Sequence, residues 1–152
     1  MNPEILVIGI GNPERGDDGA GRAVAGLLKG RLPQNTGLME HSGEGISLME
    51  SWEGVKKIIL VDAVFSGAEP GTIHRFDAAE GPFPAFLRKY STHAFGVGEA
   101  VEMARALKRM PERLVFFGVE GASFEAGAEI GPRVAESLDK VSSMVLAEAE
   151  GR

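Results

Sequence analysis

The sequence contains no cysteine among its 152 residues. Disulfide bonds, thiolate metal ligands and a cysteine nucleophile are therefore all excluded. Any metal ion bound by this chain must use nitrogen and oxygen ligands.

Positive charge is also scarce in this chain. There are 16 lysine and arginine residues against 22 aspartate and glutamate residues, which gives a formal net charge of -6. The basic residues form no cluster, and a protein that binds nucleic acid or an anionic membrane needs a basic surface to release counterions. We therefore expect a partner that is neither nucleic acid nor another polyanion.

Long apolar runs are missing as well. No stretch approaches the roughly 20 apolar residues of a membrane helix, so membrane insertion is not expected. The first four residues, Met1 to Glu4, lead directly into a strand-like run without the basic start or the cleavage site of a secretion signal. These features predict a cytoplasmic protein.

The composition is otherwise that of a globular chain. Hydrophobic residues make up 43% and charged residues 25%, close to the average for globular domains. The length fits one domain, residues 1–152, that is large enough to form its own core. The 21 glycines concentrate in segments 9–21, 43–45 and 118–131, where we expect loops that need their conformational freedom.

Several short apolar runs predict the strands of a sheet. Runs 5–10, 57–64 and 114–119 are continuous and rich in β-branched or aromatic residues, which favours buried parallel strands. Residues 38–41 form a weaker candidate strand. Residues 71–76 alternate polar with apolar side chains, as a half-buried edge strand would.

Helical spacing occurs between these runs. It predicts a helix from Ala20 to Leu28, a short helix through 48–52, a helix over 95–107 and a last helix that starts at Pro132. Strands that alternate with helices predict an α/β sandwich with a mostly parallel sheet and right-handed crossovers.

The glycine-rich loop Gly9–Gly21 follows the first strand. A dinucleotide fingerprint would need glycine where Glu14 stands, and adjacent carboxylates at a helix start would repel a pyrophosphate. The Gly-Lys-Ser/Thr ending of a phosphate-binding loop is absent too, so no organic cofactor is expected. We interpret Asp17 and Asp18 as a helix cap and a functional acid, with helix capping by both as the alternative.

Two further residues lie where ligands bind in open α/β sheets, beyond the carboxyl ends of the strands. Asp62 ends a buried strand. Burial of a carboxylate there costs free energy unless the group is paired, bound to metal or open to solvent. His93 precedes a helix, whose positive dipole end favours the neutral imidazole that ligates metals. Together with Asp18 they would suit nickel, zinc, manganese or iron.

The other two histidines give weaker signals. His74 lies within the edge-strand pattern and is expected on the surface, while His41 could approach the same crevice. Neither Gly-x-Ser-x-Gly nor His-Glu-x-x-His occurs, so serine-protease and zinc-protease chemistry has no signature in this sequence. The residues alone therefore predict a metal-binding α/β domain.

These segments resemble the nickel-iron hydrogenase maturation proteases along nearly the whole chain. Ile8–Asn12 followed by Asp17–Gly21 resembles that family's first motif, in which Asp18 takes the position of an acidic metal ligand. Val61-Asp62-Ala63 resembles the strand with the second ligand, and Ser91–Gly96 resembles the segment that supplies the histidine, His93. Gly118–Glu120 resembles the end of the last strand.

The resemblance implies a three-layer fold with a five-stranded twisted sheet flanked by helices. It also implies an endopeptidase that removes the C-terminal extension of a nickel-iron hydrogenase large-subunit precursor after nickel insertion. The nickel would arrive with the precursor and be engaged by Asp18, Asp62 and His93. Where many relatives have an Asp-Gly-Gly-Thr-like loop, this chain has His41–Gly45, which leaves that loop's substrate contacts open.

Two alternatives follow from the same residues. One is a nickel-sensing chaperone that binds the precursor with the same three ligands and leaves hydrolysis to another protein. The other is a peptidyl-tRNA hydrolase, since Gly-x-Gly-Asn-Pro also occurs at the start of that family. The second lacks its expected downstream histidine here, and the acidic charge disfavours tRNA.

Overall fold

The computed structural model describes residues 2–88 and 95–151. Their strands form one five-stranded sheet in the order β2-β1-β3-β5-β4. Four strands are parallel, and β4 runs antiparallel to β5 at one edge. The strand bounds are β1 (Ile5–Ile10), β2 (Thr36–His41), β3 (Lys57–Val64), β4 (Ile73–Asp77) and β5 (Arg113–Glu120).

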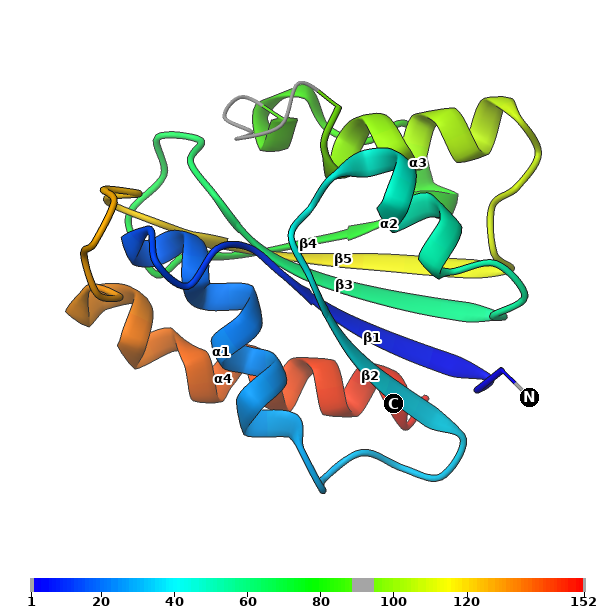
Figure 1. The fold of residues 1–152 in the computed structure, drawn as a ribbon, viewed down its shortest axis with the longest axis horizontal. Helices are drawn as coiled ribbons and strands as arrows, with labels where there is room; N and C mark the ends of the chain where they lie inside the picture. Colours follow the sequence, from blue (N-terminus) through cyan, green and yellow to red (C-terminus); the bar gives the residue numbers. More distant parts are fainter. Residues whose placement is uncertain (1, 89–94, 152) are drawn as a thin grey trace.

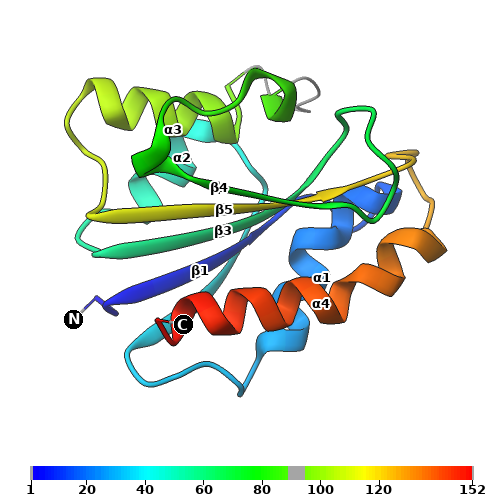
Figure 2. The same cartoon turned by 180° about the vertical axis from the view of Figure 1, so that it is seen from behind.

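Helices cover both faces of this sheet, as Figures 1 and 2 show. One face carries α1 and α4, and the other carries α2 and α3. Their bounds are α1 (Ala20–Leu28), α2 (Gly45–Ser51), α3 (Val97–Ala106) and α4 (Pro132–Ala149). Three short 3-10 turns complete the described elements: η1 (Gly16–Gly19), η2 (Ala78–Glu80) and η3 (Ala85–Arg88). The predicted α/β sandwich with a mostly parallel sheet is confirmed.

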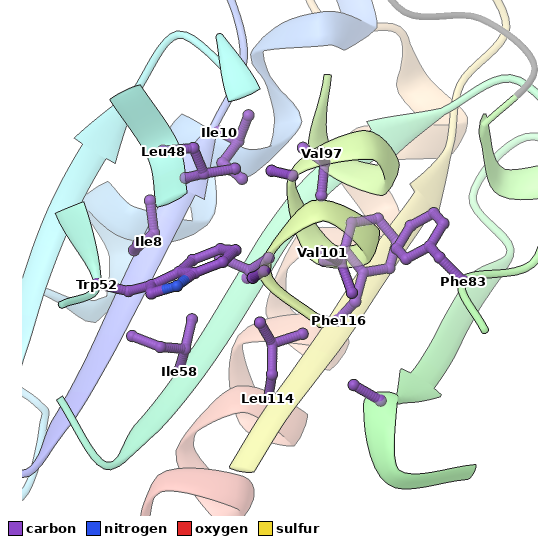
Figure 3. Packing of buried hydrophobic residues seen from close by; sticks show 14 of the residues in the cluster. Ile8, Ile10, Leu48, Trp52, Ile58, Phe83, Val97, Val101, Leu114 and Phe116 are labelled. Atoms are coloured by element: carbon purple, nitrogen blue, oxygen red, sulfur yellow. The ribbon is translucent and has the colours of Figure 1, made fainter. Parts of the chain in front are cut away.

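The central strands are apolar because both of their faces are covered. Along β3, Ile58 and Leu60 pack into the core under α2 and α3, whereas Ile59 and Val61 pack into the core under α1 and α4. Figure 3 shows the first of these cores, in which Trp52 and Phe116 fill much of the space between the sheet and the helices. Alternation between two buried layers explains the continuous hydrophobic runs in the sequence.

The predicted edge strand lies at the edge of the sheet. β4 pairs with β5 alone, and its residues are mostly half-buried, which is the position that its alternating pattern indicated. β2, at the other edge, begins at Thr36, earlier than the expected 38–41, because its first residues are polar or small and give no apolar signal. No helix in the described ranges is long and apolar enough to cross a membrane.

The parallel register brings the carboxyl ends of three strands to one level. Ile10 of β1 is paired with His41 of β2, and Gly9 is paired with Val61, the residue before Asp62. Asp62 is in turn paired with Gly118 of β5. The residues expected to carry chemistry therefore gather at this edge, as the general rule for open α/β sheets predicts.

Candidate functional site

Asp18 lies in η1, directly after the glycine-rich loop that follows β1. Its side chain is buried, with 8% of the residue exposed. The backbone N–H of Asn12 donates a hydrogen bond of 3.1 Å to Oδ2 of Asp18. The loop therefore curls back on itself and holds this carboxylate at the sheet edge.

Glycines let this turn sit directly on the strands. A Cβ at Gly21 would overlap the carbonyl oxygens of both Ile10 and Val61, so only glycine allows α1 to approach β1 and β3 this closely. Gly11 has a φ of 139°, and a Cβ there would overlap the carbonyl oxygen of Asp18. These two positions bring Asp18 toward the strand that carries Asp62.

Asp62 is the third residue from the carboxyl end of β3 and is half-buried. Burial removes water from its carboxylate, and the negative charge of Asp18 repels it, so the pKa of Asp62 lies well above the ordinary aspartate value. A hydrogen bond of 2.8 Å from the N–H of Ala63 to Oδ1 offsets part of this effect. Asp62 and Asp18 therefore interact directly through their charges.

The side chain of Asp62 lies on the sheet face covered by α2 and α3. Ile58, Leu60 and Val64 belong to the core on that face, and side chains along a strand alternate between its two faces. Gly118, paired with Asp62 on β5, puts no side chain on that face. A Cβ at Gly118 would lie 2.9 Å from the side chains of both Phe116 and Val64, so these two side chains pack against the backbone of β5 beside Asp62.

Asp17, next to Asp18, has a different role from the helix cap that the sequence suggested. Its carboxylate accepts hydrogen bonds from the N–H groups of Ala122 (2.7 Å) and Ser123 (3.2 Å) through Oδ2, and of Gly131 (2.7 Å) through Oδ1. Only 2% of the residue is exposed. It therefore holds the loop after β5 against η1. Among the residues that the structure describes, no side chain caps η1 or α1.

The neighbouring backbone strengthens this junction. Asp17 N–H donates to the carbonyl of Ser123, Gly16 N–H donates to Ala128, and Gly127 N–H donates to Glu14. Two loops more than 100 residues apart in the chain are thereby joined beside Asp18. The two consecutive aspartates of the motif thus have different roles. Asp17 holds the two loops together, whereas Asp18 interacts with Asp62.

His93 lies outside the described residues, so the predicted grouping of Asp18 and Asp62 with this imidazole stays a prediction. The chain is described again from Phe95, whose carbonyl accepts a 2.7 Å hydrogen bond from the N–H of Gly45. Gly45 also lies against the Phe95 ring, where a Cβ would overlap it. Phe95 is therefore held against the first turn of α2.

The loop His41–Gly45 is fixed by its own side chains. His41 Nδ1 accepts a hydrogen bond from Gly43 N–H (2.9 Å), so the neutral ring carries its proton on Nε2, which lies 3.0 Å from Ser47 Oγ. Glu44 caps α2 by accepting from the N–H groups of Ile46 and Ser47. Both ring nitrogens of His41 are thus engaged, Nδ1 by this loop and Nε2 by α2.

His74 differs from the surface residue that its strand pattern predicted. Its side chain is only 16% exposed, and its Nε2 lies 3.0 Å from Oε1 of the fully buried Glu120. Glu120 also accepts hydrogen bonds from the N–H and hydroxyl groups of Ser66 and from the N–H of Gly67. The prediction for His74 was wrong because alternation along a strand does not reveal a buried carboxylate on the neighbouring strand.

Sequence reasoning missed the structural roles of Asp17 and Glu120. Both are carboxylates in glycine-rich or strand-end segments, where a functional role looks equally plausible. Glycines at 121 and 131 leave room around Asp17, but that signal is visible only once the two loops are known to meet. Within residues 2–88 and 95–151, no three acidic or imidazole side chains form a group able to hold a metal ion.

Comparison with known proteins gives a consistent result. The sequence profile of the hydrogenase maturation protease family matches residues 23–148. The chain is 32% identical over 148 residues to the hydrogenase expression/formation protein HupD of Thiocapsa roseopersicina, covering 95% of this chain and 67% of HupD. It is 32% identical over 151 residues to HupD of Bradyrhizobium diazoefficiens, covering 95% of this chain and 78% of that protein.

The fold has solved counterparts as well. The hydrogenase maturating endopeptidase HybD from E. coli superposes with a TM-score of 0.82 at 26% identity, covering 99% of this chain and 93% of HybD. Its fold is likewise built on a five-stranded, mostly parallel sheet flanked by helices. The similarity extends over the strand ends at which Asp18 and Asp62 lie.

Proposed function

This chain belongs to the hydrogenase maturation protease family, and we propose that Asp18, Asp62 and His93 bind the nickel of its substrate. As a member, it is a peptidase that processes a hydrogenase large-subunit precursor. The nickel is part of the precursor, and the proposed cleavage removes the C-terminal extension after nickel has been inserted. No organic cofactor is part of this proposal, and a cytoplasmic site of action stays a prediction.

The interaction between Asp18 and Asp62 carries this proposal. The charge of Asp18 raises the pKa of Asp62, and such a pair of carboxylates favours a cation, because a cation removes their repulsion. Divalent nickel accepts oxygen and imidazole ligands. A bound cation would favour the carboxylate form of Asp62, so that both acids could act as ligands.

A third ligand is needed from outside this pair. His93 supplies an imidazole by the family resemblance, and Phe95, two residues further on, is held by Gly45 at the N-terminus of α2. Nickel coordinated at the carboxyl edge of the sheet would fix the neighbouring peptide bond relative to the carboxylates.

Hydrolysis then requires a water molecule and a polarised carbonyl group. In the proposed reaction, water attacks the scissile carbonyl carbon, the C–N bond breaks, and the leaving amine takes up a proton. The nickel or a carboxylate polarises the reacting groups. The new C-terminus belongs to the processed large subunit, and the extension leaves as a peptide.

A cleavage assay on the cognate precursor tests this function. Nickel-loaded and nickel-free precursors are incubated with the wild-type protein and with Asp18→Asn, Asp62→Asn and His93→Gln variants, and the products are separated on a gel. We expect cleavage of the loaded precursor alone and no cleavage by the variants, while each variant keeps its circular dichroism spectrum. Processing by all three variants at the wild-type rate would refute the proposed roles.

The alternatives make different predictions in the same assay. A chaperone would bind the loaded precursor without shortening it, and membership of a peptidase family argues against that outcome. A peptidyl-tRNA hydrolase would release tRNA regardless of nickel, and neither the family match nor the net charge of -6 favours it.

A further inference from the structure

A groove with a volume of about 510 Å³ opens next to Asp18, at the carboxyl edge of the sheet. It is lined by loop residues 11–15, by Arg22 of α1 and by Ser42, which follows β2. The link to the site is direct, because Asn12 lines the groove and its N–H binds the Asp18 carboxylate. A peptide bound here would lead away from the proposed nickel position.

The same loop lines a second hollow of about 540 Å³ on its other side. Residues 12–15 face residues 126–129 of the loop after β5 across this hollow. Loop 12–15 itself is held by a hydrogen bond from Arg15 N–H to the Asn12 carbonyl and by another from Glu14 N–H to Asn12 Oδ1. The groove wall is therefore preorganised, which reduces the entropy lost when a ligand binds.

Two arginine residues, Arg15 and Arg22, line the groove in a protein whose net charge is negative. Arg22 donates from Nε to the Gly11 carbonyl at 2.7 Å, which fixes the position of its side chain. Among the described carboxylates it is paired with Glu40, with Nη1 and Oε1 3.9 Å apart, too long for a hydrogen bond. Its terminal nitrogens therefore remain able to bind a ligand in the groove.

Arg15 is the second cation, on the loop between the two hollows. Its Nε is buried and has no hydrogen-bond acceptor within the described residues. A buried donor without an acceptor is costly, so a shift of the Arg15 guanidinium toward an acceptor supplied by a ligand would recover this energy. The one acidic residue in the same groove is Glu14, which is exposed.

We propose that this groove binds the C-terminal segment that the peptidase removes, and that Arg15 and Arg22 bind carboxylate groups of that segment. The proposal rests on the proposed function. A C-terminal segment always ends in a carboxylate, and guanidinium groups bind carboxylates through paired, charge-assisted hydrogen bonds. Without local cations, an anionic segment would be repelled by the acidic protein.

Binding of the isolated segment tests the proposal without requiring cleavage. The probe is a synthetic peptide with the sequence of the extension of the cognate precursor, and its affinity is measured by calorimetry. We expect Arg15→Gln and Arg22→Gln each to weaken binding about tenfold, since each removes a charge-assisted contact. Lys29→Gln removes the same charge from an exposed position outside the groove and should leave the affinity unchanged.

Modified peptides identify which carboxylate is bound. If amidation of the C-terminus abolishes the effect of the arginine substitutions, the terminal carboxylate is the ligand. If only replacement of acidic side chains by amides does so, the side chains are the ligand. Equal affinity of the wild type and the double arginine variant, or no binding by the wild type, would overturn the proposal.

Steady-state cleavage of the nickel-loaded precursor gives a second measurement. We expect the arginine variants to raise KM about tenfold and to leave kcat within about twofold, because they alter binding of the segment and not the reacting groups. A fall in kcat at constant KM would contradict the groove assignment. If the wild-type protein itself did not cleave the precursor, the proposed function would be refuted. The peptide affinities would still decide the role of the groove.

Discussion

At the scale of single residues, the central feature is the pair of carboxyl groups of Asp18 and Asp62. The pKa of Asp62 is raised by burial and by the charge of Asp18. A raised pKa means that the protonated carboxyl stabilises the fold more than the carboxylate does. Its favourable contribution is therefore complete below the unfolded-state pKa of about 3.9 and is lost as the pH rises through the folded-state value.

Asp62→Asn should therefore make the protein more stable at neutral pH. Each pKa unit of the difference corresponds to about 1.4 kcal/mol, and each kcal/mol corresponds to roughly 2–4 °C in Tm for a chain of this size. Thermal unfolding should show a higher Tm for the variant at pH 7 and equal values below about pH 4.

Asp139→Asn is the matched control, since Asp139 lies exposed on α4. It should leave Tm unchanged at both pH values. A lower Tm for Asp62→Asn at pH 7 would mean that the carboxylate is stabilised in the fold, contrary to the raised pKa. Gain of stability with loss of cleavage would be typical of a functional residue.

Not every candidate residue could be assigned from sequence. Asp18 and Asp62 were identified because each follows a predicted strand or loop at one edge of the sheet. Asp17 has the same chemistry and lies next to Asp18, so its role could be recognised only from the three N–H groups around it. His74 was misplaced because its partner, Glu120, lies on a different strand.

At the scale of elements, the loop after β5 determines how firmly η1 is held. The Asp17 carboxylate joins the two through three backbone hydrogen bonds. Asp18 is the next residue in η1, so freedom in this junction would displace a proposed nickel ligand. The junction is therefore a structural requirement for the site.

Asp17→Asn should loosen this junction. The amide group would replace one accepting oxygen with a donor, so at least one backbone N–H would lose its charge-assisted partner. We expect a loss of about 2 kcal/mol in the free energy of unfolding and faster hydrogen exchange over residues 121–131. Denaturant unfolding and mass-spectrometric exchange measure the two effects.

Glu125→Gln, in the same loop but exposed, is the control for charge removal. It should leave both the unfolding free energy and the exchange rates as in the wild type. Unchanged exchange in Asp17→Asn would show that the loop is held by its backbone contacts alone.

The helices and strands themselves were largely predictable. Continuous apolar runs gave β1, β3 and β5, and helical spacing gave α1, α3 and α4. β2 was found only in part, because its first two residues are threonine and glycine, which give no apolar signal. The contact between Gly45 and Phe95 could not be foreseen, since it joins two elements that are distant in sequence.

At the scale of the whole molecule, charged side chains join the sheet to α4 at the edge opposite the site. Glu148 of α4 binds Lys57 Nζ at 2.8 Å and an Arg75 terminal nitrogen at 2.7 Å. Burial would raise the pKa of Glu148, but hydrogen bonds from Arg75 and Lys57 outweigh it, so the pKa is lowered. Glu148 therefore stabilises the fold above its unfolded-state pKa of about 4.3, and this contribution is lost as the pH falls through the folded-state value.

Glu148→Gln should lower the stability of the molecule at neutral pH. We expect a loss of about 2 kcal/mol at pH 7, discounted for the partial exposure of Arg75. The difference from the wild type should shrink as the pH falls below about 4. Urea unfolding at several pH values measures this.

Glu69→Gln breaks the exposed ion pair with Arg133 and should have little effect at any pH. If Glu148→Gln and Glu69→Gln changed the free energy of unfolding equally, burial would add nothing to the strength of the Glu148 ion pairs. Cleavage activity should persist in both variants, because Glu148 binds Lys57 at the amino end of β3 and the exposed Glu69 is paired with Arg133 of α4.

The order of the whole sheet explains why sequence reasoning could locate the site. Parallel strands with right-handed crossovers place their carboxyl ends together, so Asp18 and Asp62 had to approach one another once the strands were recognised. The groove beside them could not be predicted, because it depends on how the loop 12–15 folds against Arg22 and Ser42. The fold and the positions of the two acids follow from local patterns in the sequence, whereas the groove depends on contacts between loops.

The most direct test of the nickel proposal is X-ray absorption spectroscopy at the nickel edge of the loaded precursor. Spectra are recorded for the precursor alone and for its complex with the wild-type protein or with Asp18→Asn, freeze-quenched before cleavage. We predict that the wild-type complex adds oxygen or nitrogen ligands to the nickel and that the variant complex adds fewer. A nickel spectrum that stays the same on binding the wild-type protein would contradict the claim that these residues engage the metal.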